Sequence, residues 1–199
     1  PDGAHFELSP MYHQHILFRI FDCIALIRSN NIFDSGLLNV FEEKSELMLS
    51  WLERIVFKNG DLPQVNDCSI NVYPTLSNLK DYAIKLNIFP KTKDLKESGY
   101  RMIKLKKYEC FLDIGNIGPD YMPGHSHSDT FSFIVYVKEK PLIVDTGIST
   151  YNSSSKRLYE RSTPSHNTVM VNNIEQSEVW SSFRVARRVY PKIINDLKH

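Results

Sequence analysis

The spacing of the apolar residues changes once along this 199-residue chain, and the change limits the folds that it can adopt. Up to about residue 86, apolar residues recur at the three- and four-residue intervals of helices that bury one face. From residue 100 onward the apolar stretches are short, rich in β-branched and aromatic residues, and partly alternating, as in β-strands. Helices followed by strands predict an α+β protein with segregated parts, not a parallel α/β sheet.

Three helices are expected in the first part. The first begins at Ser9-Pro10, because serine caps free backbone N–H groups and proline fits the first helical position, and it ends near Ser29-Asn30-Asn31. The second ends at Asn59-Gly60, where glycine can take the left-handed conformation that stops a helix. A shorter helix is expected over about residues 75–86.

A polar connection at residues 89–99 carries Pro and Gly and separates the helices from the predicted strands. We expect strands at residues 100–114, 130–137, 141–145, 166–171 and 182–190. A hairpin through Lys138-Glu139-Lys140 returns Asp145 to a point near His127. The chain therefore predicts two domains, with a helical part at residues 1–90 and an antiparallel β part at residues 91–199.

The overall charge excludes one class of partner. The chain has 24 Lys and Arg against 23 Asp and Glu, for a formal net charge of +1, so we expect no nucleic-acid partner. No apolar run approaches the roughly 18 residues that span a bilayer, so no transmembrane segment is expected. The three cysteines are widely spaced and predict free thiols. None of these features indicates an oligomeric state.

Two histidines one residue apart, His125 and His127, stand out as candidate functional residues. On a strand, alternate side chains share a face, so both imidazoles can reach one metal ion or one substrate. His127, Asp145 and His166 form a candidate zinc set, because imidazole nitrogen and carboxylate oxygen both bind this ion. The alternative for each residue is an ordinary polar side chain at a strand end.

Tyr12 lies in the first turn of the first expected helix, where the helix dipole favours negative charge and can help a phenolate form. It is a candidate proton-transfer residue, or else a tyrosine that packs its ring.

Arg161 can bind carboxylates or sulfates in bidentate fashion, or lie on a solvated face. Aromatic residues that can stack on sugar rings or pack in the core are Tyr151, Tyr159, Trp180 and Phe183.

Several motifs follow one another in the second half of the chain: Gly124-His125-Ser126-His127-Ser128-Asp129, Pro141 to Gly147, Arg161-Ser162-Thr163, His166-Asn167-Thr168-Val169 and Gln176-Ser177-Glu178. In this order they resemble the heparinase II/III family of polysaccharide lyases. The opening, Asp2-Gly3 and Glu7 to His13, also resembles a segment of that family. The resemblance implies that residues 1–90 are the last helices of an incomplete α/α toroid. It implies that residues 91–199 begin an antiparallel β-sandwich, with the active site between the two.

The resemblance also implies β-elimination on an acidic polysaccharide that contains uronic acid, whether heparin-like, alginate-like or capsular. It implies catalytic roles in proton transfer for Tyr12 and His125. It implies a structural divalent metal, zinc in many members, held by His127, Asp145 and His166. We further expect Glu7 and Arg161 to bind substrate, and the protein to be periplasmic or secreted.

Some features depart from the family pattern. The chain begins at Pro1, and the Asn or His that neutralises the substrate carboxylate in the family would lie upstream of it, so we expect a fragment or processed chain that is inactive alone. Two alternatives remain open. One is a cupin-like metal-dependent enzyme, although Asp129 stands where cupins usually carry Glu. The other is a non-catalytic carbohydrate-binding or assembly protein.

Overall fold

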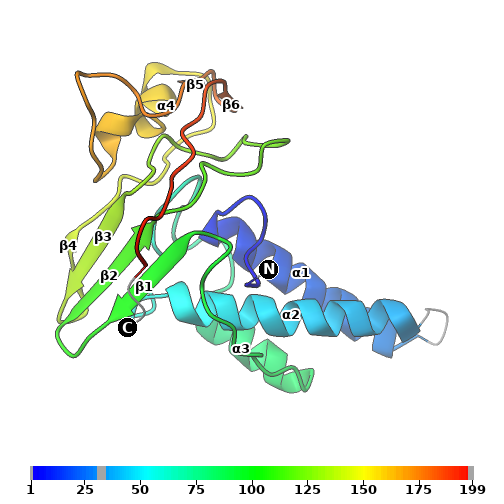
Figure 1. Cartoon of the computed structure of the whole chain (residues 1–199). Helices are drawn as coiled ribbons and strands as arrows, with labels where there is room; N and C mark the ends of the chain where they lie inside the picture. Colours follow the sequence, from blue (N-terminus) through cyan, green and yellow to red (C-terminus); the bar gives the residue numbers. More distant parts are fainter. Residues whose placement is uncertain (1, 31–34, 197–199) are drawn as a thin grey trace.

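The computed structural model describes residues 2–30 and 35–196, and it places a group of helices beside one antiparallel sheet (Figure 1). The helices are α1 (Pro10–Arg28), α2 (Ser35–Ile55), α3 (Leu76–Lys85) and α4 (Ser155–Glu160), with a short 3₁₀ turn, η1 (Thr163–Ser165). The strands are β1 (Tyr100–Lys104), β2 (Tyr108–Asp113), β3 (Phe133–Val137), β4 (Lys140–Ile143), β5 (Val179–Trp180) and β6 (Arg184–Val185). The chain thus combines helices with antiparallel strands, as expected.

The three long helices form where the apolar spacing predicted them. Ser9 caps α1 by accepting a hydrogen bond from the Tyr12 N–H at 3.4 Å, and Pro10 occupies the first helical position. Thr75 caps α3 in a reciprocal capping box with Asn78. The three predicted helices are therefore confirmed, and the starts of α1 and α3 follow from these caps. Helix α2 ends at Ile55, before the predicted stop at Asn59-Gly60.

The sheet has four strands in the order β1-β2-β3-β4, and each neighbouring pair is antiparallel. The stretch that was expected to be one strand, residues 100–114, contains both β1 and β2. Lys138 and Glu139 both have positive φ, 51° and 63°, which is the conformation of a two-residue hairpin turn. The predicted hairpin between β3 and β4 is therefore confirmed.

Two predicted strands are wrong. Residues 166–171 form no strand in the structure, and only an isolated bridge joins Val171 to Ile174. Of residues 182–190, only the two residues of β6 are extended in a ladder, paired with β5. Asn167 gives one reason, because its side-chain amide donates to the backbone oxygens of Phe133 and Val144 and holds a loop against the sheet. Helix α4 was not expected.

One hydrophobic cluster joins the helices to the sheet. The ring of Trp51 from α2 lies 5.9 Å from that of Tyr100 in β1, and Tyr100 lies 4.8 Å from Phe111 in β2. The chain enters β1 through Gly99, whose φ is +76° and where a Cβ atom would come within 2.1 Å of the Gly115 backbone. Helices and sheet therefore share a core, and the division near residue 90 stays a prediction.

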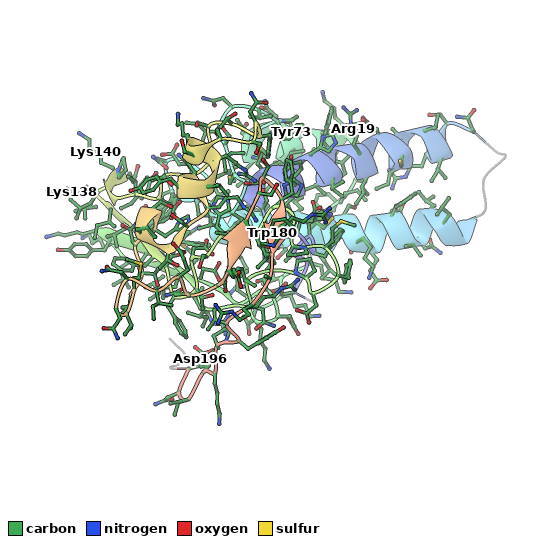
Figure 2. The ribbon with its side chains drawn as sticks, turned by 90° about the horizontal axis from the view of Figure 1, so that it is seen from above. Arg19, Tyr73, Lys138, Lys140, Trp180 and Asp196 are labelled. Carbon is green, nitrogen blue, oxygen red and sulfur yellow. The ribbon has the colours of Figure 1, made fainter. Side chains whose placement is uncertain are left out.

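The loops after β2 and β4 gather near the N-terminal end of α1. In the view from above, Lys138 and Lys140 lie at one end of the molecule, α1 and α2 extend towards the other end, and Trp180 lies near the middle (Figure 2). The short elements α4, β5 and β6 lie above the upper ends of the sheet strands, at the top of the view in Figure 1. This loop-rich region contains the predicted site residues.

Candidate active site

A short loop at Asn66 and Asp67 connects the start of α1 to the H-x-H segment. The Ser9 hydroxyl, which caps α1, also donates to the backbone oxygen of Asp67 at 2.7 Å. The Asp67 N–H donates to the backbone oxygen of His125, and the His127 N–H donates to the side-chain oxygen of Asn66, both at 3.0 Å. Residues near positions 10, 67 and 126 are thereby held together although they are far apart in the sequence.

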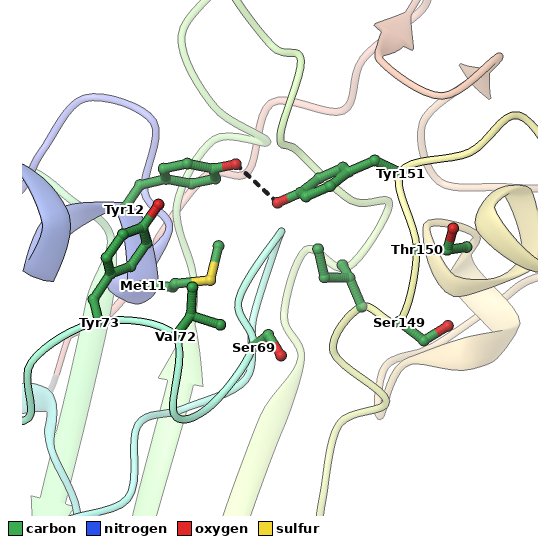
Figure 3. Close-up of a pocket in the computed structure, with 9 residues that line it drawn as sticks. Met11, Tyr12, Ser69, Val72, Tyr73, Ser149, Thr150 and Tyr151 are labelled. Carbon is green, nitrogen blue, oxygen red and sulfur yellow. Dashed lines mark hydrogen bonds between the residues drawn. The ribbon is translucent and has the colours of Figure 1, made fainter.

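The structure brings Tyr12 and His125 into contact. Their ring centroids lie 4.4 Å apart, and the Tyr12 hydroxyl is 2.9 Å from the hydroxyl of Tyr151 (Figure 3). A pocket of about 240 Å³ lies beside the two tyrosines. Its lining residues are Met11, Tyr12, Ser69, Val72, Tyr73, Ile148, Ser149, Thr150 and Tyr151. Tyr12 therefore lines a small pocket, and His125 contacts the Tyr12 ring without lining that pocket itself.

Tyr12 is a weaker acid in the structure than its helix position suggests. Burial raises its pKa above 10.0, the hydrogen bond with Tyr151 opposes this only in part, and the negative charge of Asp67 raises it further. Burial likewise raises the pKa of Tyr151. Burial therefore opposes the phenolate that the helix N-terminus was expected to favour, and the role of Tyr12 stays a prediction. At neutral pH Tyr12 is a neutral phenol that can donate a proton.

Asp67 lies at the centre of a buried hydrogen-bonding network. One of its oxygens, Oδ2, is 2.7 Å from His125 Nδ1 and 2.7 Å from Arg157 Nη2. The other, Oδ1, is 2.9 Å from His127 Nε2 and also accepts from Arg157 Nη1. Burial opposes ionisation of Asp67, but the hydrogen bonds from His125, His127 and Arg157 outweigh it and hold its pKa well below the usual range.

Helix α4 supplies two fully buried arginines one turn apart, Arg157 and Arg161. Beyond Asp67, Arg157 donates to the backbone oxygen of Ser182 at 3.1 Å and 2.9 Å. Arg161 donates to the oxygen of Ser126, between the two histidines, at 3.1 Å and 2.9 Å, and to that of Ser181 at 3.0 Å. This arrangement stabilises the H-x-H loop, and substrate binding by Arg161 stays a prediction.

Tyr151 and Phe183 cover the buried ion pair. Their rings stack with centroids 5.7 Å apart, and the Arg157 guanidinium carbon lies 5.2 Å from the Tyr151 centroid and 5.4 Å from the Phe183 centroid. Both rings also lie 6.2 Å from the His125 ring. The two aromatic rings shield the contact between Arg157 and Asp67 from water while leaving part of their own surface exposed.

Glu7 lies on the outer side of His125. Its Oε1 is 3.8 Å from His125 Nε2, and its Oε2 is 3.7 Å from His5 Nδ1. His125 therefore has one nitrogen bonded to Asp67 and the other turned towards the partly exposed side of the loop. The Glu7 carboxylate can contact a molecule that binds on this side of His125. The role of Glu7 in substrate binding stays a prediction.

The three predicted metal ligands lie near one another but do not surround one point. Asp145 Oδ2 is 2.7 Å from His166 Nδ1, and Oδ1 accepts from the Gly147 N–H. The rings of His127 and His166 are 5.2 Å apart, and their other nitrogens, Nδ1 and Nε2, are buried without a hydrogen-bond partner in the described structure. Within residues 2–30 and 35–196, no group of three or more His, Cys, Asp or Glu side chains is arranged to hold a metal.

The donor chemistry of a metal site is therefore present in part. Two free imidazole nitrogens fit a divalent ion, whereas the carboxylate of Asp145 contacts His166 instead. The expectation that a strand beginning at His166 completes the trio is wrong, because His166 follows η1 in a loop. A metal held by His127, Asp145 and His166 stays a prediction.

Three residues of this region were missed or assigned another role in the sequence. Asp67 was missed because its side-chain partners lie 58 to 90 positions away, so no local pattern marks it. Arg157 has a weak signal, since it stands four residues before Arg161 in a helix that Ser154 caps. Tyr151 was noted only as an aromatic residue that can stack on sugar rings or pack in the core.

No helix in the part of the chain that the structure describes is long and apolar enough to cross a membrane.

Comparisons of the sequence match two parts of one family. The C-terminal region of heparinase II/III-like proteins matches residues 89–198, and the heparinase II/III N-terminus matches residues 1–97. No curated protein matches the chain. The two matches together extend over the helices and the strands.

The fold is similar to that of several solved structures. A heparinase III superposes with a TM-score of 0.67 at 19% identity, over 90% of this chain and 32% of that one. A second heparinase III gives 0.68 at 17%, over 90% and 35%. Heparan sulfate lyase HepC from Pedobacter heparinus gives 0.65 at 20%, over 88% and 31%. The chain thus shares their fold and spans about a third of their length.

Proposed function

The chain belongs to the heparinase II/III family, and from that premise we propose that it supplies part of the active site of a polysaccharide lyase. The proposed substrate is an acidic polysaccharide containing uronic acid, of the heparan-like, alginate-like or capsular class. The proposed reaction is β-elimination. Similarity in fold to proteins described as heparinase III and heparan sulfate lyase supports the lyase class.

β-Elimination requires three things of the enzyme. A base removes the proton at C5 of the uronate, the C4–C5 double bond forms as the C4–O bond breaks, and an acid protonates the leaving oxygen. Negative charge that develops on the uronate carboxylate must also be neutralised. We propose that this chain supplies the base and the acid.

The contact between Tyr12 and His125 carries the proposal. Tyr12 is a neutral phenol at neutral pH, because burial raises its pKa, so it is suited to protonate the leaving oxygen. His125 faces it with a ring separation of 4.4 Å and is suited to take the C5 proton. The Tyr151 hydroxyl, 2.9 Å from that of Tyr12, orients the donor. Acid and base thus lie on one side of a shared substrate position.

A screen of the full-length protein against uronate polysaccharides tests the function. We expect at least one polymer to yield an unsaturated product, detected by its ultraviolet absorbance, and we expect His125→Ala to lower turnover by about 10²–10⁴-fold. Circular dichroism on the same samples shows whether the variant is folded. Binding of a polymer with no unsaturated product from any member of the panel would instead support a non-catalytic carbohydrate-binding protein.

A structural divalent metal is a second part of the proposal, with zinc as the ion and His127, Asp145 and His166 as its ligands. The free nitrogens of the two histidines support it, and burial lowers the pKa of His127 to about 4, which keeps the imidazole in the neutral form that binds metals. We expect His127→Ala to lose metal and stability, and His125→Ala to lose turnover with metal retained. Elemental analysis of the purified wild-type protein and the two variants measures their metal content. Equal metal content in all three proteins would refute the ligand assignment.

The family assignment argues against the cupin-like alternative, and so does the position of the H-x-H segment. His125 and His127 lie in a loop between β2 and β3, whereas in a barrel enzyme of that kind they would lie on strands. The four-stranded sheet is open in the described residues.

A further inference from the structure

The carboxylate of Asp67 is the only group that joins His125, His127 and Arg157 among the described residues. Neither Asp67 nor Arg157 has any exposed side-chain surface, so water does not compete for these hydrogen bonds. The backbones of the two residues are also joined, because the Asp67 N–H donates a hydrogen bond to the backbone oxygen of His125. The orientation of Asp67 relative to His125 is therefore set from two directions.

Arg157 keeps Asp67 in its ionised form. Two guanidinium nitrogens donate to the two carboxylate oxygens, which is the bidentate geometry in which arginine binds carboxylates most firmly. Tyr151 and Phe183 cover the guanidinium, and the Ser182 oxygen accepts two further hydrogen bonds from it. The arginine side chain is a cation that is not deprotonated in proteins. Asp67 is therefore a permanent acceptor.

An ionised carboxylate can accept hydrogen bonds but cannot donate them. The Nδ1 atom of His125, 2.7 Å from Asp67 Oδ2, must then carry the hydrogen of that bond. In neutral histidine only one ring nitrogen is protonated, so Nε2 carries the free electron pair. Nε2 is the atom on the partly exposed side, near Glu7. The network thus directs the basic atom of His125 away from Asp67, towards Glu7.

We propose that Asp67, held by Arg157, is a positioning residue that fixes His125 in the tautomer whose Nε2 accepts the substrate proton. The proposal rests on the proposed function of His125 as the base. The proton passes from C5 of the uronate to Nε2, and the electron pair of the C5–H bond forms the C4–C5 double bond. The C4–O bond breaks with its electron pair on the leaving oxygen, which takes the proton of Tyr12, and the Nδ1 proton of His125 stays in its bond with Asp67. Asp67 is not protonated in this step, and its negative charge stabilises the imidazolium that forms.

The tautomer can be measured without any substrate. In full-length protein labelled with ¹⁵N-histidine, two-bond ¹H–¹⁵N correlations distinguish the nitrogen that carries the proton, and comparison with His125→Gln assigns the signal. At about pH 8, where ordinary histidines are neutral, we expect His125 in the Nδ1–H form. An Nε2–H form in the wild-type protein would overturn the proposal, whether or not the enzyme turns over any polymer.

Asp67→Asn tests the same point by kinetics. The asparagine amide can donate to Nδ1, which favours the Nε2–H tautomer and blocks the basic atom. We expect kcat to fall by about 10²–10⁴-fold with KM changed less than about threefold, and the ¹⁵N signature to switch. Asp2→Asn is the matched control, because Asp2 is also a buried carboxylate but is bonded to Ser98 and Lys96 instead. It should leave kcat and the tautomer unchanged.

A double-mutant cycle separates positioning from general support of the fold. If Asp67 acts through His125, Asp67→Asn adds no further loss of kcat when His125 is already alanine. An equal loss in both backgrounds would overturn the proposal, as would an unchanged kcat in the single variant. Should Asp67→Asn fail to fold, the double variant Asp67→Asn/Arg157→Met removes both buried charges, and its ¹⁵N spectrum should show the switched or mixed tautomer. If no polymer is cleaved by the wild-type enzyme, the proposed function fails, and the wild-type tautomer still decides the role of Asp67.

Discussion

The helix–sheet core and the region around Asp67 are both closed to solvent, but different kinds of side chain fill them. The core is built from large apolar residues without exposed surface, such as Trp51, Leu52 and Phe111. Around Asp67 the residues with the same lack of exposure are charged or titratable, namely Arg157, Arg161 and His127. A buried apolar cluster gains stability from each contact separately, whereas a buried ionic network needs every partner present. The two regions should therefore respond differently to mutation.

The largest expected effect is in the ionic network. Arg157→Met leaves Asp67 buried without its cation, and we expect the free energy of unfolding to fall by about 3–5 kcal/mol. Urea denaturation of the full-length protein measures it. Arg187→Met is the control, because that arginine pairs with Glu178 on an exposed surface and should change stability little. A loss for Arg157→Met no larger than for the control would remove the distinction between the two regions.

Truncation of an apolar side chain in the core should lower stability without changing kcat. Leu52→Ala removes a fully buried side chain of α2, and we expect a loss of about 2–5 kcal/mol in the free energy of unfolding. Below the melting temperature kcat should be unchanged, since the residue lies among core contacts and not in the site. Leu26→Ala, at a leucine of α1 that is 56% exposed, provides the comparison and should cost much less. A fall in kcat without loss of folded protein would show that the core and site are coupled.

His13 is a polar exception within the core. Its ring lies 4.5 Å from that of Trp51, Nε2 donates to the Met48 oxygen at 2.9 Å, and Nδ1 accepts from the His5 N–H at 3.2 Å. Burial lowers its pKa to about 3 from an ordinary value of 6.5. As the pH falls, His13 of the unfolded chain takes up a proton before His13 of the folded protein does. The stability that neutral His13 contributes is therefore complete above pH 6.5 and is lost as the pH falls towards 3.

The variant His13→Gln isolates this contribution. We expect the wild-type protein to lose about 1 kcal/mol more per pH unit than the variant between about pH 6 and pH 4.5. Denaturation at several pH values measures the difference in slope. Parallel curves for the two proteins would mean that His13 is protonated in the folded core.

The smallest expected effect is in a loop that supports the network. Gly147 has φ of +57°, and a Cβ atom there would lie 2.8 Å from the Gln64 side chain and 2.9 Å from the Cys68 oxygen, next to Asp67. We expect Gly147→Ala to cost about 1–2 kcal/mol, as backbone strain plus displacement of the loop. Gly60→Ala, with φ of +94° and no atom within 4 Å, measures strain alone. A smaller loss at Gly147 than at Gly60 would show that the loop adapts freely.

The same contrast explains what could be predicted from the sequence. Helices α1, α2 and α3 and the β3–β4 hairpin follow from local spacing, caps and turn residues, so they were predicted. The proximity of Tyr12 and His125 rested on resemblance to a family, since nothing local joins two residues so far apart. The partners of Asp67 were not predicted, because hydrogen bonds across 58 to 90 positions leave no periodic signal. The strand expected at residue 166 failed, and there the Asn167 side chain bonds the backbone oxygens of Phe133 and Val144 and holds a loop against the sheet.

The most direct test of the proposed chemistry at this loop-built site is the rate of unsaturated-product formation by full-length Tyr12→Phe. Tyr82→Phe serves as the control, because it removes a hydroxyl that bonds Asp22 on the helices, away from the site. If Tyr12 is the proton donor beside His125, Tyr12→Phe lowers product formation by about 10²–10⁴-fold while Tyr82→Phe retains the wild-type rate. Equal rates for Tyr12→Phe and the wild-type enzyme would contradict it.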